Sequence, residues 1–238
     1  MKTQLKAHWL GHSAFHIETP GGEHILIDPF LKDNPTTPDE WKEPEQVDYI
    51  LLTHGHGDHV GDTLEIAKRT GCKVAAIFDL TGLLTEKHGL NEDQAVGFNK
   101  GGTVDFEEFS VTMVSANHSS SFQGDYAGDP AGLILSFEDD IAIYHMGDTN
   151  IFADLKLYGD LYRPHVALVP MGDHFTMGPE EAAMAVEMVR PKLAIPIHYG
   201  TMPVLTGDPD EFKNFVEQRT DTKALVPEAG ENFLVQMG

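Results

Sequence analysis

The sequence is poor in cysteine, in basic residues and in long apolar runs, and each shortage excludes a class of protein. Its one cysteine, Cys72, allows no intrachain disulfide, which fits a reducing compartment. Only 16 lysines and arginines stand against 38 acidic residues, so the net charge is −22. Such a chain repels phosphate groups, which excludes nucleic acids and anionic membranes as partners. No segment reaches the run of about 18 apolar residues that a membrane span needs.

The N-terminal stretch adds no targeting signal. His8, His12 and His16 interrupt every apolar run there that is long enough for the core of a signal peptide. We therefore expect a cytoplasmic protein that acts on a small molecule, and we leave open whether it forms a homo-oligomer.

Short apolar segments separated by glycine and proline predict a strand-rich fold with a few helices. Helices are predicted at residues 64–71, 79–88, 179–190 and 208–219, and the third opens with Pro179 and two glutamates, as helices commonly do. The proline-rich stretch 33–46 is predicted to be a surface loop. Strands are predicted at residues 5–10, 14–19, 24–30, 47–52, 73–78, 101–106, 109–116, 131–137, 140–146, 165–170, 192–198, 223–227 and 232–236.

The order of these segments predicts an α/β fold in which two sheets pack together with helices outside. The many strands exclude a helical bundle, and the strand-rich ends argue against a simple doubly wound sheet. No linker divides the chain, so we expect a single domain over residues 1–238.

The strongest chemical signal is THGHGDH at residues 53–59, here called the histidine turn. His54 and His56 are spaced to reach one cation, while Asp58 and His59 face the opposite side and serve a second cation. Gly55 and Gly57 are expected to let the backbone fold closely. Imidazole with some carboxylate suits zinc and other first-row ions better than calcium. The alternative is a polar loop that is merely rich in histidine.

A metal site needs further ligands, and these are expected where other strands end, because loops gather there. His118 follows strand 109–116, Asp148 follows strand 140–146, and His198 ends strand 192–198. We assign His54, His56 and His118 to one metal and Asp58, His59 and His198 to a second. Asp148 bridges the two, because a carboxylate has two oxygens. The cofactors are therefore two divalent ions, with zinc favoured and manganese or iron as alternatives.

The remaining histidines divide into two groups. His12 and His174 lie in turns of small residues directly after apolar runs, so both are candidates for lining the catalytic pocket. The others occur in strand or helix contexts and are expected to be structural: His8, His16, His24, His88, His145 and His165.

The histidine turn, followed along the chain by His118, Asp148 and His198, resembles the ligand pattern of the metallo-β-lactamase superfamily. The segments LGHSAF (10–15), ILIDPF (25–30) and FTMGPEEAA (175–183) are similar to the uncharacterised metal-dependent hydrolases related to ascorbate-6-phosphate lactonase. The resemblance implies a four-layer αβ/βα sandwich of two mixed sheets packed face to face, with a dinuclear site at one edge and the same seven ligands. It also implies that Asp28 orients the histidine turn.

The resemblance, with the ligand pattern, predicts a hydrolase whose dinuclear-metal-bound hydroxide cleaves an ester, lactone or phosphodiester bond in a small molecule. Asp58 is the candidate to carry the proton. Antibiotic hydrolysis is not expected, because the commonest β-lactamases of this type have a cysteine ligand and an arginine where this chain has Asp148 and His59. Cys72 lies far from any ligand position. The alternative is a non-catalytic metal-binding or regulatory protein, which loss of a ligand would favour; none of the seven is missing.

Overall fold

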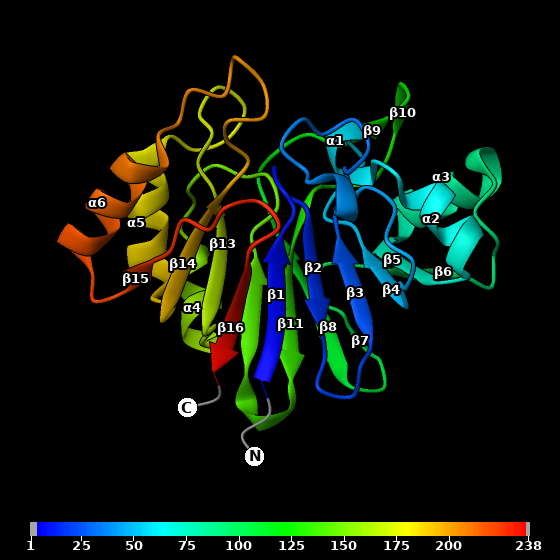
Figure 1. The fold of residues 1–238 in the computed structure, drawn as a ribbon, viewed down its shortest axis with the longest axis horizontal. Helices are drawn as coiled ribbons and strands as arrows, with labels where there is room; N and C mark the ends of the chain where they lie inside the picture. The colour runs from blue at the N-terminus through cyan, green and yellow to red at the C-terminus, as the bar shows by residue number, and fades with distance from the viewer. Residues whose placement is uncertain (1–3, 237–238) are drawn as a thin grey trace. The chain divides into compact units, whose positions relative to one another are not determined.

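Residues 4–236, which the computed structural model describes, form two compact units that each contain one seven-stranded mixed sheet (Figure 1). The first unit consists of the chain up to Gly102, the segment Ser119–Pro130 and the chain from Glu228 on. The second consists of Thr103–His118 and Ala131–Pro227. The predicted α/β class with two mixed sheets is therefore confirmed, while the single domain stays a prediction.

In the first unit the sheet has the order β16-β1-β2-β3-β4-β5-β6. Strands β3 to β6 run parallel to one another, and β1 has the same direction because it pairs antiparallel with β2, which pairs antiparallel with β3. The C-terminal ends of β1, β3, β4 and β5 therefore meet at one edge of this sheet. The bounds are β1 Gln4–Trp9, β2 Phe15–Glu18, β3 His24–Ile27, β4 Tyr49–Leu51, β5 Lys73–Ile77, β6 Ala95–Phe98 and β16 Asn232–Gln236.

Short helices and one hairpin complete the first unit: α1 (Gly57–Val60), α2 (Thr63–Thr70), α3 (Phe78–His88) and the hairpin of β9 (Ser121–Phe122) with β10 (Asp125–Tyr126). Helices α2 and α3 end at Gly71 and Gly89, whose φ angles of 77° and 79° glycine adopts without strain. Figure 1 shows α1 and the hairpin at the same end of the unit, beyond the C-terminal ends of β3 and β4.

In the second unit the sheet has the order β15-β14-β13-β12-β11-β8-β7. Strands β12 to β15 are parallel, and β8 shares their direction because β11 lies antiparallel between β8 and β12. The C-terminal ends of β8, β12, β13 and β14 therefore meet at one edge. The bounds are β7 Thr103–Asp105, β8 Phe109–Ser115, β11 Ala131–Phe137, β12 Ala142–His145, β13 Val166–Pro170, β14 Leu193–Ile197 and β15 Lys223–Ala224.

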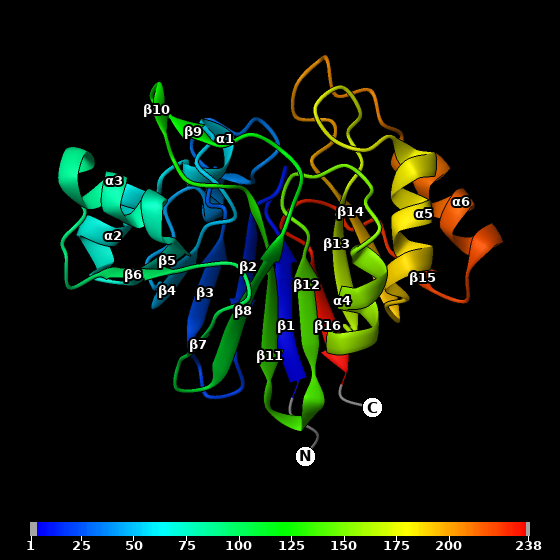
Figure 2. The same cartoon turned by 180° about the vertical axis from the view of Figure 1, so that it is seen from behind.

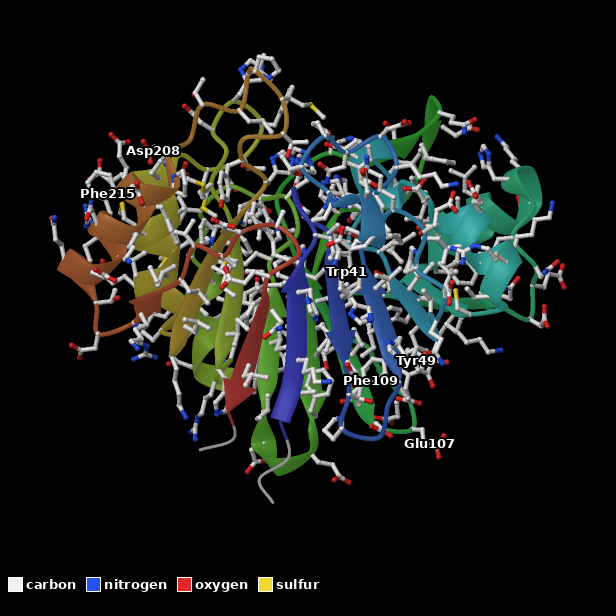
Figure 3. All side chains as sticks on the ribbon, in the orientation of Figure 1. Trp41, Tyr49, Glu107, Phe109, Asp208 and Phe215 are labelled. Atoms are coloured by element: carbon white, nitrogen blue, oxygen red, sulfur yellow. The ribbon has the colours of Figure 1, made fainter. Side chains whose placement is uncertain are left out.

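Three helices pack on this sheet: α4 (Leu155–Tyr162), α5 (Pro179–Val189) and α6 (Pro209–Arg219). Figure 2 shows α4 alongside β12 and β13. Asp208 caps α6 by accepting hydrogen bonds from the backbone N–H groups of Asp210 and Glu211, and Figure 3 labels it at the start of that helix. Val169, Val186 and Phe212 belong to the buried core that joins sheet and helices.

The structure contains elements that the sequence did not predict, namely α1, α4, β6 and the β9–β10 hairpin. Asp154 precedes helix α4, but the helix has Gly159 in its interior and no acidic residue in its first turn, so its sequence signals are weak. A Cβ atom at Gly159 would lie 2.5 Å from the carbonyl oxygen of Val189, so the glycine allows α4 to pack closely where α5 ends. Among residues 4–236, no helix has both the length and the apolar character to cross a lipid bilayer.

Candidate functional site

In the first unit the candidate ligands gather where the parallel strands end. His12 follows β1, Asp28 follows β3, and the histidine turn follows β4 and enters α1. The common direction of these strands brings residues far apart in sequence to one edge. Ligand atoms of His12, Asp58 and His59 lie within 4.8 Å of one another.

Asp28 is fully buried and organises the histidine turn. Its carboxylate accepts hydrogen bonds from the backbone N–H of Thr53 at 2.8 Å and from the Thr53 hydroxyl at 2.6 Å. The same carboxylate lies 2.7 Å from Nδ1 of His59, which is also fully buried. The expectation from the family resemblance, that Asp28 orients this loop, matches these contacts.

These contacts decide which ring nitrogens carry protons. Because Nδ1 of His59 donates to Asp28, Nε2 of the neutral ring keeps the lone pair that a metal needs. The single hydroxyl proton of Thr53 goes to Asp28, so Nδ1 of His54, 3.1 Å away, must donate to the Thr53 oxygen. Nε2 of His54 then also keeps its lone pair. Thr53 was not among the residues singled out from the sequence, although it directly precedes the first histidine.

The nitrogen atoms of the histidine pair are spaced as ligands of one cation. Nε2 of His54 and Nδ1 of His56 lie 3.0 Å apart. Two nitrogens that each lie about 2.1 Å from a zinc ion are separated by roughly 3.0–3.4 Å, depending on the angle between them. The other ring nitrogen of His56 is 3.3 Å from the hydroxyl of Ser119. The donor set therefore fits a divalent first-row cation.

The close approach predicted for the two glycines holds for Gly55 and is wrong for Gly57. A Cβ atom at Gly55 would lie 2.3 Å from Cβ of Ala127, and its N–H donates to the hydroxyl of Ser120 at 3.1 Å. Gly55 thus fixes the histidine turn against the segment Ser119–Pro130. Gly57 has no atom within 4 Å of an added Cβ, because it begins α1 and faces open space.

His12 lies closer to the candidate ligands than its separation of 46 residues from Asp58 suggests. Its Nε2 is 3.1 Å from Oδ2 of Asp58, and its side chain is fully buried. His12 and Asp28 have φ angles of 54° and 45°, in the left-handed region that residues other than glycine rarely occupy. Strain of this kind concentrates at functional sites, and it aims both side chains at the histidine turn.

In the second unit, two candidate ligands, His118 and His198, lie around one carboxylate oxygen of a third, Asp148. Oδ2 of Asp148 lies 3.0 Å from Nε2 of His198 and 3.5 Å from Nε2 of His118. These residues follow β14, β12 and β8, whose C-terminal ends share an edge. His198 has a φ of 60°, and an added Cβ at Gly172 would lie 1.8 Å from its carbonyl oxygen, so the glycine is required beside it.

The remaining histidines lie where their surroundings explain them. His174 is exposed on a turn after β13, with its ring against Phe175. His145 is fully buried, and its Nδ1 accepts a hydrogen bond from the N–H of Gly147, as a structural histidine does. Beside His198, burial and then the charge of Asp210 raise the pKa of Tyr199 to about 12, so its hydroxyl stays protonated at neutral pH.

Known proteins that are similar to this chain include proteins named metal-dependent hydrolases. A family model described as a β-lactamase superfamily domain matches residues 23–199. A protein of Roseiflexus castenholzii named UPF0173 metal-dependent hydrolase is 48% identical over 212 residues, which is 86% of each chain. One of the same name from Methanosarcina mazei is 43% identical over 235 residues, covering 96% of this chain and 98% of the other.

Solved structures with this fold extend the comparison. Igni18, described as a novel metallo hydrolase from the hyperthermophilic archaeon Ignicoccus hospitalis, is 39% identical. It superposes with a TM-score of 0.88 over 98% of this chain and 99% of its own. A metallo-β-lactamase fold protein from Bacillus subtilis, only 11% identical, reaches a TM-score of 0.73 over 98% of this chain and 100% of its own, which shows the fold alone.

Proposed function

Because the chain belongs to the β-lactamase superfamily, and within it to a family of metal-dependent hydrolases with the metallo-β-lactamase fold, we propose that it hydrolyses an ester, lactone or phosphodiester bond in a small molecule. The superfamily resemblance noted from the sequence is thereby confirmed. The bond and the number of cations are our proposal.

The observation that carries the proposal is the hydrogen-bond pattern of the histidine turn. Asp28 and Thr53 together set the protonation of His54 and His59 so that Nε2 of each ring keeps a lone pair. An ordinary solvated loop has no need of a buried carboxylate that orients histidines, whereas metal ligands commonly have one. The polar-loop alternative does not account for this arrangement.

We assign the ligands as the sequence suggested. His54, His56 and His118 hold one cation, Asp58, His59 and His198 hold the other, and Asp148 bridges. One oxygen of Asp148, Oδ2, lies near Nε2 of both His118 and His198, which we assign to different cations, and this supports a bridging role. Zinc suits a set this rich in imidazole, and manganese or iron are the alternatives.

The protein's own residues then have distinct tasks. When bound, divalent cations lower the pKa of a water ligand and polarise the bond to be broken. Asp58 is the candidate group for moving the proton, and His12 holds its carboxylate at 3.1 Å. His174 is the second pocket histidine proposed from the sequence, and its exposed position on a turn leaves it able to contact a substrate.

The proposal is tested with ester, lactone and phosphodiester probes on zinc- and manganese-loaded protein. Asp148→Ala and His56→Ala are each expected to reduce hydrolysis by more than about 100-fold, because each removes a direct ligand. Asp154→Ala is the matched control: it lies six residues after Asp148, is exposed, and its side chain makes no capping hydrogen bond to α4. Full activity in the Asp148→Ala and His56→Ala proteins, or activity indifferent to chelation, would contradict the proposal.

A further inference from the structure

Three loops of the second unit follow β12, β13 and β14 at the edge where Asp148 and His198 lie: residues 146–154, 171–178 and 198–208. Figure 1 shows the last two, in yellow and orange, extending together beyond the ends of their strands. None of the three contains a lysine or an arginine. Two of the unit's three arginines pair elsewhere, Arg190 with Asp160 and Arg219 with Glu180, and the third, Arg163, lies at the C-terminal end of α4, before β13 begins.

The loops expose apolar side chains instead. Phe175 is 53% exposed and Val204 is 44% exposed, so both offer apolar surface to a ligand. Phe175 stands on a tight turn in which Asp173 and His174 have φ angles of 62° and 55°. Two successive residues of this turn therefore have strained backbones, and the ring of Phe175 that follows them stays partly exposed to solvent.

The two loops are joined rigidly to each other and to His198. The N–H of Gly207 donates to the carbonyl of Gly172 at 3.1 Å. A Cβ at Gly207 would lie 1.9 Å from the carbonyl oxygen of Met171, so only glycine allows this approach. Leu205 is buried and would lie 3.4 Å from a Cβ at Gly172. Phe175 and Val204 thus belong to two loops whose backbones are fixed to each other, and one of these loops begins at His198.

The acidic residues of these loops are engaged with the backbone. Asp208 accepts hydrogen bonds from the first turn of α6, and Oδ1 of Asp173 accepts one from the N–H of His174 at 2.8 Å. The negative charge of these two aspartates repels an anionic ligand. Because both carboxylates accept backbone hydrogen bonds, their presence is explained by the loop structure and does not indicate a cationic ligand.

We propose that Phe175 and Val204 bind an uncharged, apolar carbon chain of the substrate, outside the bond that is broken. This proposal rests on the proposed function, whose reaction it narrows to neutral esters or lactones. A substrate bearing a further phosphate or carboxylate would find no basic partner in these loops.

The test measures binding to metal-loaded protein by calorimetry, with butyramide, octanamide, and octanamide carrying a terminal carboxylate or a terminal ammonium group. The amide end is the same in all four, so only the chain differs. Octanamide has four more methylenes than butyramide, and on two exposed side chains we expect burial equivalent to fewer than two of them. At about fourfold for each fully buried methylene, octanamide is expected to bind about tenfold more tightly than butyramide. It is also expected to bind about tenfold more tightly than either charged analogue.

Phe175→Ser and Val204→Ser are expected to remove most of this gain. Leu161→Ser is the matched control, because Leu161 is 70% exposed but lies on α4. Octanamide binding that is unchanged in both loop variants would overturn the proposal. A charged analogue that binds as tightly as octanamide would overturn it equally.

Hydrolysis of 4-nitrophenyl butyrate and octanoate separates this proposal from the proposed function. If neither ester is cleaved while octanamide binding depends on Phe175, the proposed function fails and the apolar site stands. If both esters are cleaved equally well and the loop variants match the wild type, the hydrolase stands and the apolar site fails.

Discussion

His16 illustrates how burial makes a single side chain sensitive to acid. It is 5% exposed, its ring lies 4.9 Å from that of Trp41, and its Nε2 lies 2.9 Å from Nδ1 of His24. Burial, followed by the neighbouring charges of His24 and His8, lowers the pKa of His16 from 6.5 to about 4. The folded chain therefore resists protonation that the unfolded chain accepts.

We predict that the free energy of unfolding falls as the pH drops from 6.5 towards 4. In this window the unfolded His16 is protonated and the folded one is neutral, so protons favour unfolding; above 6.5 both are neutral and the full stability is present. The loss is at most about 3 kcal/mol, from about 1.4 kcal/mol per pKa unit. Urea unfolding at pH 7 and pH 4.5 measures it. His16→Gln should lose less over this interval, and an equal loss in both proteins would contradict the assignment.

Asp28 acts at the same scale through the histidines that it orients. Asp28→Asn is expected to weaken zinc binding by about 10–100-fold, because an amide holds the proton on Nδ1 of His59 less firmly than a carboxylate. Competition with a chromogenic chelator measures the affinity.

Thr53→Val is the comparison for Asp28→Asn. It removes the hydroxyl between Asp28 and His54 but keeps the carboxylate on His59, so we expect a smaller loss of affinity. If Asp28→Asn bound zinc as tightly as the wild type, Asp28 would be only a turn residue.

The sequence predicts correctly that His118, Asp148 and His198 follow the C-terminal ends of apolar strands, and their role as ligands stays a prediction. It does not predict contacts that depend on how strands are ordered. His12 approaches Asp58 only because β1 and β4 end at the same edge, and no spacing between residues 12 and 58 encodes this. His8 and His16 are expected to be structural, and they lie opposite each other because β1 pairs with β2, with both rings near Trp41.

At the scale of the elements, the two glycines of the histidine turn can be compared directly, because they lie two residues apart in different surroundings. Gly55→Ala is expected to destabilise the protein by about 1–3 kcal/mol, because the new methyl group would overlap Ala127. Gly57→Ala places a methyl group in open space at the start of α1 and is expected to be neutral or to stabilise by up to about 1 kcal/mol. Urea unfolding measures both. Equal effects of the two substitutions would contradict the packing described for Gly55.

Elements with strong local signals were predicted and elements without them were not. Helix α5 has proline and two glutamates at its start, and α6 has an aspartate cap, so both match their predictions closely. Strand β6 is only four residues long, includes Gly97, and contains no buried residue, so neither its composition nor its pattern distinguishes it from a loop. Its place is determined by pairing with β5.

At the scale of the whole molecule, the family could be recognised because its chemistry is concentrated in one short turn and three strand ends. The two sheets follow from the order of strands and helices along the chain and their mixed character from the family resemblance, whereas their strand order does not follow from the sequence. No single motif predicts the substrate. The proposed ligands would activate water, whereas the residues of the surrounding loops would determine which molecule binds beside it.

The most direct test of the central claim is the number of transition-metal ions bound per chain, measured by elemental analysis after zinc loading and removal of free metal. We predict about two ions per wild-type chain and fewer in Asp148→Ala, the variant that lacks the bridging carboxylate, with activity lost to chelators and restored by zinc. A wild-type chain that binds one ion or none, or hydrolysis that survives complete removal of metal, would contradict the account.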